Sequence, residues 1–167
     1  MDEALFAWRD FYGAVANASA ALVGLVFVGL SIRLTRSALP ASAKALALVS
    51  LANLLYPLYV SLAMLLPTGA PGVQATALLL PAAVCLLELA VAFRLERRAH
   101  DVISRPSAVY RYVLPLAASL VLVAGALGLL ASAEVALFAP VVFIGVMFVV
   151  GSHNAWTLLL TSLEGDR

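Results

Sequence analysis

Five apolar stretches follow one another along the chain, and short polar or charged segments separate them. A helix needs about 20 mainly apolar residues to cross the hydrocarbon core of a bilayer. The pattern predicts five transmembrane helices, at about residues 11–32, 45–66, 73–93, 112–131 and 135–158. We expect an all-α integral membrane bundle that forms a single domain over residues 1–167.

The connections between these helices are short, which restricts how the helices are arranged. The segments "PTGAPG" (67–72) and "ASAE" (131–134) leave room only for tight turns. The second and third helices, and the fourth and fifth, should therefore be antiparallel neighbours. Residues 94–111 form the only sizeable polar segment, too short for an enzyme domain, and the Arg105-Pro106 step should end any helix that continues into it.

Lysine and arginine residues lie almost entirely on one side of the predicted membrane. Arg9 precedes the first helix, whereas the other nine of the ten follow helix one, helix three or helix five. Because cytoplasmic segments retain basic residues, the N-terminus should be outside and the C-terminus in the cytoplasm. This predicts a multi-pass protein of the cell (inner or plasma) membrane.

The basic residues of the predicted cytoplasmic loop 94–111 have two interpretations. They can anchor at anionic lipid headgroups, as basic residues at an inner interface usually do, or they can dock a cytoplasmic partner. The residues expected to meet headgroups are Arg94, Arg97, Arg98 and Arg105.

Composition supports a membrane protein and argues against several other classes. The chain is 64% hydrophobic and 11% charged, and its mean hydropathy of +1.06 is outside the usual range of soluble domains. A net charge of +1 provides no basic surface for nucleic acid. The one cysteine, Cys85, rules out an internal disulfide or a thiolate metal cage, and the acidic start "MDEALF" predicts no cleaved secretory signal.

Small residues form stripes on two of the predicted helices. In a bilayer, small residues let helix backbones approach closely, so a stripe of them marks a packing face more often than a pore. The first stripe contains Gly13, Asn17, Ala20, Gly24 and Ser31, and the second contains Ala117, Ala124, Gly128 and Ser132. We expect helix-packing seams above all at Gly13, Ala20, Gly24, Ala124 and Gly128.

Polar residues share one face on the second helix and one face on the third. The face on the third helix contains Gln74, Ala77, Pro81, Cys85, Glu88 and Ala92, and that on the second contains Ser50, Asn53, Tyr56 and Pro57. Each proline removes an amide and frees a carbonyl one turn earlier, so both helices should be kinked. The two helices look like a matched pair with polar inner faces.

Glu88 is the one charge well inside an apolar span, about 9 Å along the helix axis from Arg94. A carboxylate at that depth must face the bundle interior or water, find a partner or take up a proton. Two interpretations stay open: a glutamate that only pins helix packing or reaches the interface, and one that handles protons or cations. The predicted ion or proton pathway contains Glu88, Asn53, Tyr56, Cys85, His153 and Asn154.

The fifth helix turns polar at "VVGSHNAW" (149–156) because it enters the inner interface, where Trp156 is expected at headgroup level. His153 should lie roughly one turn shallower than Glu88 and within reach of it through two side chains. It is either an interfacial hydrogen bonder or a proton relay. Asn154 should share a helix side with Pro140, Ile144, Met147 and Gly151.

Sequence motifs for catalysis or cofactor binding are missing. The chain has no phosphate-binding glycine-rich loop, no HExxH pair and no Gly-x-Ser-x-Gly elbow. With two histidines in total, a histidine metal site or paired haem ligation within one chain is not expected. We predict no enzymatic activity, no cofactor and no metal.

The segments "DFYGAVANASAALVGLVFVGLSIRL" and "GSHNAWTLLL" resemble the ends of an uncharacterised family of small bacterial multi-pass integral membrane proteins. The resemblance covers roughly a quarter of the chain and implies no activity. A preference for arginine over lysine, with much alanine, leucine and valine, fits a high-GC bacterial source.

Two functions follow from these observations. The first is an oligomeric channel or transporter-like protein, because five helices leave little room for a closed pathway within one protomer and the seams would supply subunit contacts. The alternative is a non-catalytic structural or accessory subunit, in which the seams bind another membrane protein and Glu88 is a packing residue. A membrane enzyme is the remaining class.

Overall fold

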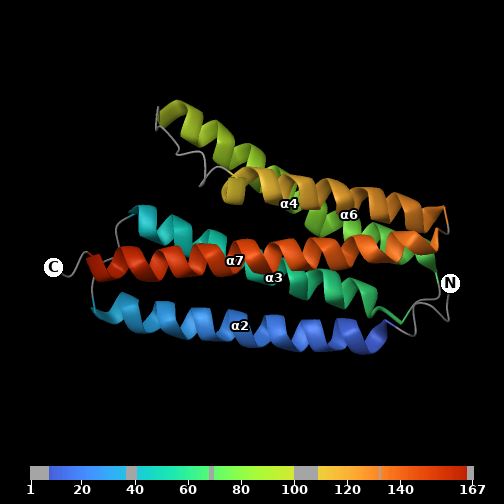
Figure 1. The fold of residues 1–167 in the computed structure, drawn as a ribbon, viewed down its shortest axis with the longest axis horizontal. Coiled ribbons are helices and arrows are strands. Elements are labelled where there is room, and N and C mark those ends of the chain that lie inside the picture. The colour runs from blue at the N-terminus through green and yellow to red at the C-terminus, as the bar shows by residue number, and fades with distance from the viewer. Residues whose placement is uncertain (1–7, 37–40, 68–69, 100–108, 132, 165–167) are drawn as a thin grey trace.

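The computed structural model describes residues 8–36, 41–67, 70–99, 109–131 and 133–164, and these residues form helices joined by short turns, with no strand among them. The all-helical prediction is confirmed over this part of the chain. The helices, drawn in Figure 1, are α2 (Arg9–Arg36), α3 (Ala41–Met64), α4 (Pro71–Ala99), η1 (Val109–Val113), α6 (Leu114–Leu130), η2 (Glu134–Leu137) and α7 (Phe138–Glu164).

Within the part of the chain that the structure describes, four helical segments are long and apolar enough to cross a membrane: Arg9–Gly29, Gly72–Arg94, Val109–Leu130 and Glu134–Thr157. Among the described residues, α3 contributes a shorter apolar stretch, Val49–Met64. Each predicted span overlaps one of these segments. The largest difference is at α4, which continues to Ala99 and so takes in the start of the predicted loop 94–111. The Arg105-Pro106 step lies outside the described residues.

The helices form two groups that meet along α7. The most extensive packing joins α3 to α7, α4 to α6 and α2 to α3, and α6 also packs on α7. The predicted neighbours α3 and α4 pack on each other far less than either packs on its main partner. In Figure 1, the end of α4 that bears Ala99 diverges from α3 and α7. Pro57 and Pro81 lie inside α3 and α4, as the sequence indicates.

The core lies where these two groups meet. Val60 of α3, Leu78 of α4, Leu122 of α6 and the α7 residues Phe143 and Met147 are fully buried in it. Equally apolar side chains, such as Leu25, Leu80, Leu87 and Val135, are exposed on the outside. An apolar exterior of this kind suits a lipid environment, in which close packing rather than hydrophobic burial selects the core residues.

Glycines permit the closest helix contacts. A Cβ on Gly125 would collide with Ala139, and a Cβ on Gly128 would lie 2.8 Å from the Cβ of Ala136, so both glycines let α6 lie against the η2–α7 segment. A Cβ on Gly151 would lie 3.0 Å from Leu54 Cδ2, so this glycine lets α7 approach α3. These positions need small residues for a steric reason.

The start of α6 has an irregular turn with a clear cause. Pro115 lies in the first turn of α6, and η1 directly before it is a turn of π-helix. Proline supplies no amide to the carbonyl of Arg111, and its ring crowds that carbonyl. The wider turn relieves this contact, and it changes the direction of the side chains that precede α6.

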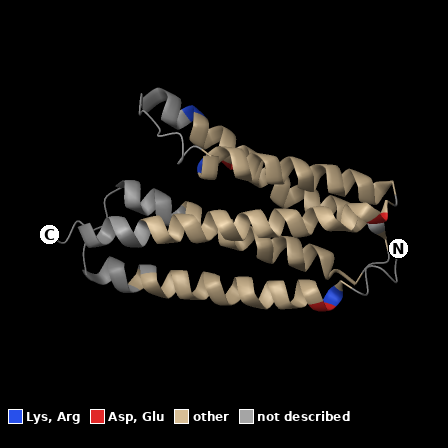
Figure 2. Cartoon of the chain, viewed as in Figure 1, with Lys and Arg blue, Asp and Glu red and all other residues tan. Residues whose placement is uncertain are grey.

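Charged side chains gather at the two ends of the bundle (Figure 2). Arg9 and Asp10 begin α2 and Glu134 begins η2, whereas Arg94 and Arg111 lie towards the opposite end, in α4 and η1. α2 begins and α7 ends at opposite ends of the bundle (Figure 1). Glu88 lies between the two charged ends, within an apolar span.

Candidate functional site

The central feature of the site is a hydrogen bond between α3 and α4. The Tyr56 hydroxyl donates to Glu88 Oε2 over 2.7 Å. Tyr56 is buried, whereas Glu88 is exposed on α4, inside the apolar span Gly72–Arg94. The tyrosine hydroxyl is the donor and the carboxyl oxygen is the acceptor, so the bond joins α3 to α4 through two polar side chains. Two residues of the predicted pathway are therefore in direct contact.

Packing from α7 fixes the Tyr56 ring. Phe143 makes an edge-to-face contact with it, with ring centroids 6.1 Å apart and planes at 82°. Phe143 is itself fully buried in the core. The ring therefore has apolar support on one side while its hydroxyl reaches Glu88, so the donor is held in position by the fold.

Two further polar groups lie behind this hydrogen bond. Cys85, one turn before Glu88 on α4, is buried and interacts electrostatically with both Tyr56 and Glu88. Its thiol lies beside the side chain of Ser119 on α6. Ser119 is fully buried, and its hydroxyl has no hydrogen-bond partner of ordinary geometry among the described residues. Side chains from α3, α4 and α6 thus converge at one place.

The asparagines of the predicted pathway lie at the neighbouring α3–α7 contact. Asn53 is 7% exposed and Asn154 is 8% exposed, so both amides are buried. The Cβ of Asn53 is 3.4 Å from the position that a Cβ would take on Gly151, one turn before Asn154. Asn53 is also one turn before Tyr56. The amides therefore extend the polar region from the Glu88 site towards the end of α7.

The residues expected to share a side with Asn154 are all buried with it: Pro140, Ile144, Met147 and Gly151. This side of α7 faces the bundle interior. The helical spacing used in the sequence analysis therefore groups the residues as the structure does.

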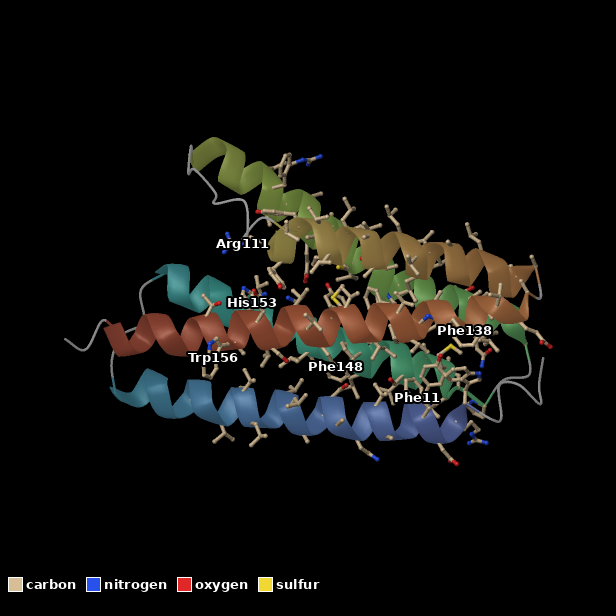
Figure 3. All side chains as sticks on the ribbon, viewed as in Figure 1. Phe11, Arg111, Phe138, Phe148, His153 and Trp156 are labelled. Carbon is tan, nitrogen blue, oxygen red and sulfur yellow. The ribbon has the colours of Figure 1, made fainter. Side chains whose placement is uncertain are left out.

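His153 has a different partner from the one the sequence suggested. Its ring is exposed and stacks on Tyr110 of η1, with centroids 4.2 Å apart and planes at 19°. Among the described residues, the structure shows no contact between His153 and Glu88. Figure 3 shows His153 on the side of α7 that faces Arg111 of η1. The stack joins α7 to η1 at the end of the bundle where α4 diverges.

The predicted packing seams fall into two groups. Gly128 lies at the α6–η2 contact, whereas Ala20, Gly24 and Ala124 are exposed and Gly13 is half-buried. No described atom outside the helix backbone lies within 4 Å of a Cβ built on Gly13 or Gly24. The α2 stripe therefore faces away from the other helices of this chain.

The basic residues expected at headgroups are described only in part. Arg94 is exposed on α4. Arg97 and Arg98 continue the same helix, although only their backbone is described, and Arg105 lies outside the described residues. Among the described residues, no three histidine, cysteine, aspartate or glutamate side chains form a group that could hold a metal ion.

Sequence reasoning missed three residues of this region. They are Tyr110, Ser119 and Phe143, and each contacts a predicted site residue. Tyr110 could have been found as an aromatic residue just before a span at the basic side of the membrane. The others resemble ordinary core residues in sequence, because their role depends on which helix lies opposite.

Comparison with known proteins found no match for this chain. No model of a protein family matches it, and no curated protein and no solved structure is significantly similar to it. The fold and the site define a class only: an all-helical bundle with four helices that are long and apolar enough to cross a membrane.

Proposed function

We propose that this protein is a small channel or transporter-like protein of the bacterial cell membrane, that it works as a homo-oligomer, and that Glu88 is its central functional residue. The proposal assigns it no catalytic activity and no cofactor. Its five helices cross the membrane with α2, α4 and α7 running inward, so the end with Arg94 and Arg111 is cytoplasmic. The excess of basic residues on that side supports this orientation.

The observation that carries the proposal is the hydrogen-bonded carboxylate of Glu88. Ionisable residues inside transmembrane segments are costly, and they usually belong to ion or proton pathways. Glu88 is exposed on α4, and its carboxylate is held by the hydroxyl of the buried Tyr56 at 2.7 Å.

The exposed face of α2 supports an assembly of several copies. Asn17, Ala20 and Gly24 are exposed there, and α2 packs mainly on α3. Small residues allow close approach of a second helix, and an amide such as that of Asn17 gains from a hydrogen-bond partner in hydrocarbon. Contact through α2 would place several copies of the Glu88 site around one axis.

The test is solute flux through purified protein in liposomes. Wild type and Glu88→Gln are compared across pH for proton and alkali-cation flux, after their oligomeric states are shown to be equal. Glu134→Gln, at the opposite end of the bundle, is the matched control. Flux that is lost in Glu88→Gln and kept in Glu134→Gln supports the proposal, whereas no flux from folded wild type contradicts it.

The alternative is a structural or accessory subunit of a membrane complex, and the same α2 face is the observation that favours it. On this proposal the face binds a different membrane protein and Glu88 is a packing residue. Crosslinking in native membranes separates the two. A Gly24→Leu variant that loses a specific hetero-partner but keeps its own oligomeric state supports the accessory function over the channel.

A further inference from the structure

Buried polar atoms without partners lie on both sides of the apolar core. Towards the cytoplasmic end, the Ser119 hydroxyl is 0% exposed and has no hydrogen-bond partner of ordinary geometry among the described residues. Towards the other end, the hydroxyl of the buried Ser61 and Oε1 of the buried Gln74 likewise have no hydrogen-bond partner in the described part of the chain. Buried polar atoms are nearly always satisfied in folded proteins, by internal water if by nothing else. These atoms therefore indicate internal hydration on both sides of the core.

Ser119 extends the Glu88 site into the protein. The exposed carboxylate is bonded to the buried Tyr56, and Cys85 connects that pair to Ser119. We call Tyr56, Cys85 and Ser119 the inner polar cluster. A thiol is a weak donor, so its contact leaves most of the hydrogen-bonding capacity of Ser119 unfilled. A water molecule there would continue the chain of hydrogen bonds.

An apolar layer lies between the inner polar cluster and Gln74, and the buried Ser61 lies next to Val60 at the level of this layer. Val60 lies one turn beyond Tyr56, Leu122 one turn beyond Ser119, and Leu78 two turns beyond Cys85, and all three are fully buried. Apolar constrictions of this kind gate pores by dewetting. The side chains of Val60, Leu78 and Leu122 offer no ligand to a metal cation.

The groups in the inner polar cluster suit protons better than metal ions. An alkali or divalent cation needs several oxygen ligands in place of its hydration shell. The inner polar cluster offers two hydroxyls and a thiol beside the carboxylate of Glu88. The described residues contain no group of three metal-binding side chains. A proton needs only a succession of groups that can both donate and accept, and tyrosine, serine and water meet that need.

From this arrangement we infer that the transported or coupled species is the proton, and that it passes between Glu88 and the interior through Tyr56 and Ser119. The inference rests on the proposed function. In this mechanism, Glu88 is the site where the proton is exchanged with the cytoplasmic side. The apolar layer of Val60, Leu78 and Leu122 is the barrier, and the proton crosses it only when water enters the layer.

The inward transfer consists of two balanced steps. A water molecule beside Ser119 gives a proton to the Tyr56 oxygen while Tyr56 gives its own proton to Glu88 Oε2, so the carboxylate becomes a neutral acid and the water becomes hydroxide. Glu88 then releases the proton to the cytoplasmic side, and the hydroxide takes up a proton from the outer side across the hydrated layer. Tyr56 and Cys85 are titratable groups that interact with Glu88.

The experiment uses full-length protein in liposomes and conservative variants that remove one hydroxyl each. Tyr56→Phe and Ser119→Ala remove hydroxyls of the inner polar cluster. Tyr12→Phe and Ser19→Ala are matched controls, because these hydroxyls are also buried but belong to α2, outside the cluster. Proton flux is read from an internal pH dye and cation flux from potassium and sodium indicators, with the oligomeric state measured for every variant.

We expect proton flux in wild type with no potassium or sodium flux. Tyr56→Phe and Ser119→Ala should each lower proton flux about tenfold or more, as loss of a positioned proton-transfer group commonly does, whereas both control variants should keep it. Potassium or sodium flux without proton flux overturns the proton assignment but leaves the proposed function standing. Normal proton flux in Tyr56→Phe and Ser119→Ala overturns the route through the cluster. Absence of all flux overturns both proposals.

Discussion

The ring of His153 on α7 stacks on the ring of Tyr110 in η1, with centroids 4.2 Å apart. Tyr110 is within the π-helical turn that precedes Pro115, so the irregular backbone determines where its ring lies. The stack thereby connects the end of α7 to the start of α6 at the proposed cytoplasmic end of the bundle.

This stack should contribute measurably to stability. Replacing His153 with alanine, Tyr110 with leucine, and both together forms a double-mutant cycle. Aromatic pairs contribute about 0.5–1.5 kcal/mol beyond the area they bury, so we expect a coupling free energy of that size. Reversible unfolding in mixed micelles measures it. Additive single-variant effects would show that the stack contributes nothing.

Gly151 should tolerate only small side chains, because a Cβ there would already lie 3.0 Å from Leu54 Cδ2 and 3.4 Å from Asn53 Cβ. We expect Gly151→Leu to lower the free energy of unfolding by about 1–3 kcal/mol through overpacking. Gly145→Leu on the same helix is the control. No described atom outside the backbone of its own helix lies within 4 Å of the position that a Cβ would take on Gly145. Equal effects of the two variants would contradict close α3–α7 packing.

Gly125 should be more sensitive than the glycines of the predicted α2 seam. Its Cβ would collide with Ala139 and lie 3.3 Å from the carbonyl oxygen of Ala136, a backbone atom that cannot easily move. Gly125→Ala should therefore destabilise by about 1–3 kcal/mol. Gly24→Ala, at an open position, should be neutral or slightly stabilising in purified monomer because alanine favours helix. Thermal unfolding of both variants in detergent distinguishes these outcomes.

The Tyr56–Glu88 hydrogen bond should show a coupling of its own. Tyr56→Phe, Glu88→Leu and the double variant form the cycle, and leucine is used because glutamine would still accept a hydrogen bond. Side-chain hydrogen bonds in membrane proteins couple by about 1 kcal/mol. Unfolding free energies in mixed micelles test this value. If the two substitutions add independently, the hydrogen bond is not formed in the folded protein.

Thiol labelling tests the proposed orientation. In a Cys85→Ser background, Val109→Cys and Val135→Cys place single thiols at exposed positions on opposite ends of the bundle without changing any charge. A membrane-impermeant maleimide should label Val135→Cys in intact cells, and Val109→Cys only after permeabilisation. The reverse pattern would invert the topology. Wild type should label slowly in both cases because Cys85 is buried.

The lengths of the apolar stretches between charged segments were sufficient to predict the helices. Each of the five predicted ranges overlaps a helix, because the length and polarity of a membrane span are written directly in the sequence. Helix neighbours were harder to predict. The short turn between α3 and α4 suggested close packing of the pair, yet α3 packs mainly on α7 and α4 on α6. A turn brings two helix ends together but does not determine the contact along their lengths.

The candidate site was predictable where one residue is exceptional by itself. Glu88 is conspicuous as a charge within an apolar span, and Tyr56 was placed with it because the two helices that carry them were expected to pair through their polar faces. Gly125, by contrast, lies outside both predicted stripes of small residues, and only the position of Ala139 shows that it is the tightest contact. A stripe of small residues indicates that a helix can be approached closely, and the partner decides which residue is approached.

The Tyr12 hydroxyl donates to the carbonyl of Leu137 over 3.3 Å, and Trp8 packs edge-on against Phe138. These contacts join residues that are separated by most of the chain. During synthesis, α2 is made long before the residues that complete these contacts. This end of the bundle can therefore close only after η2 and the start of α7 have been made, and a chain that stops before η2 would leave α2 without these contacts.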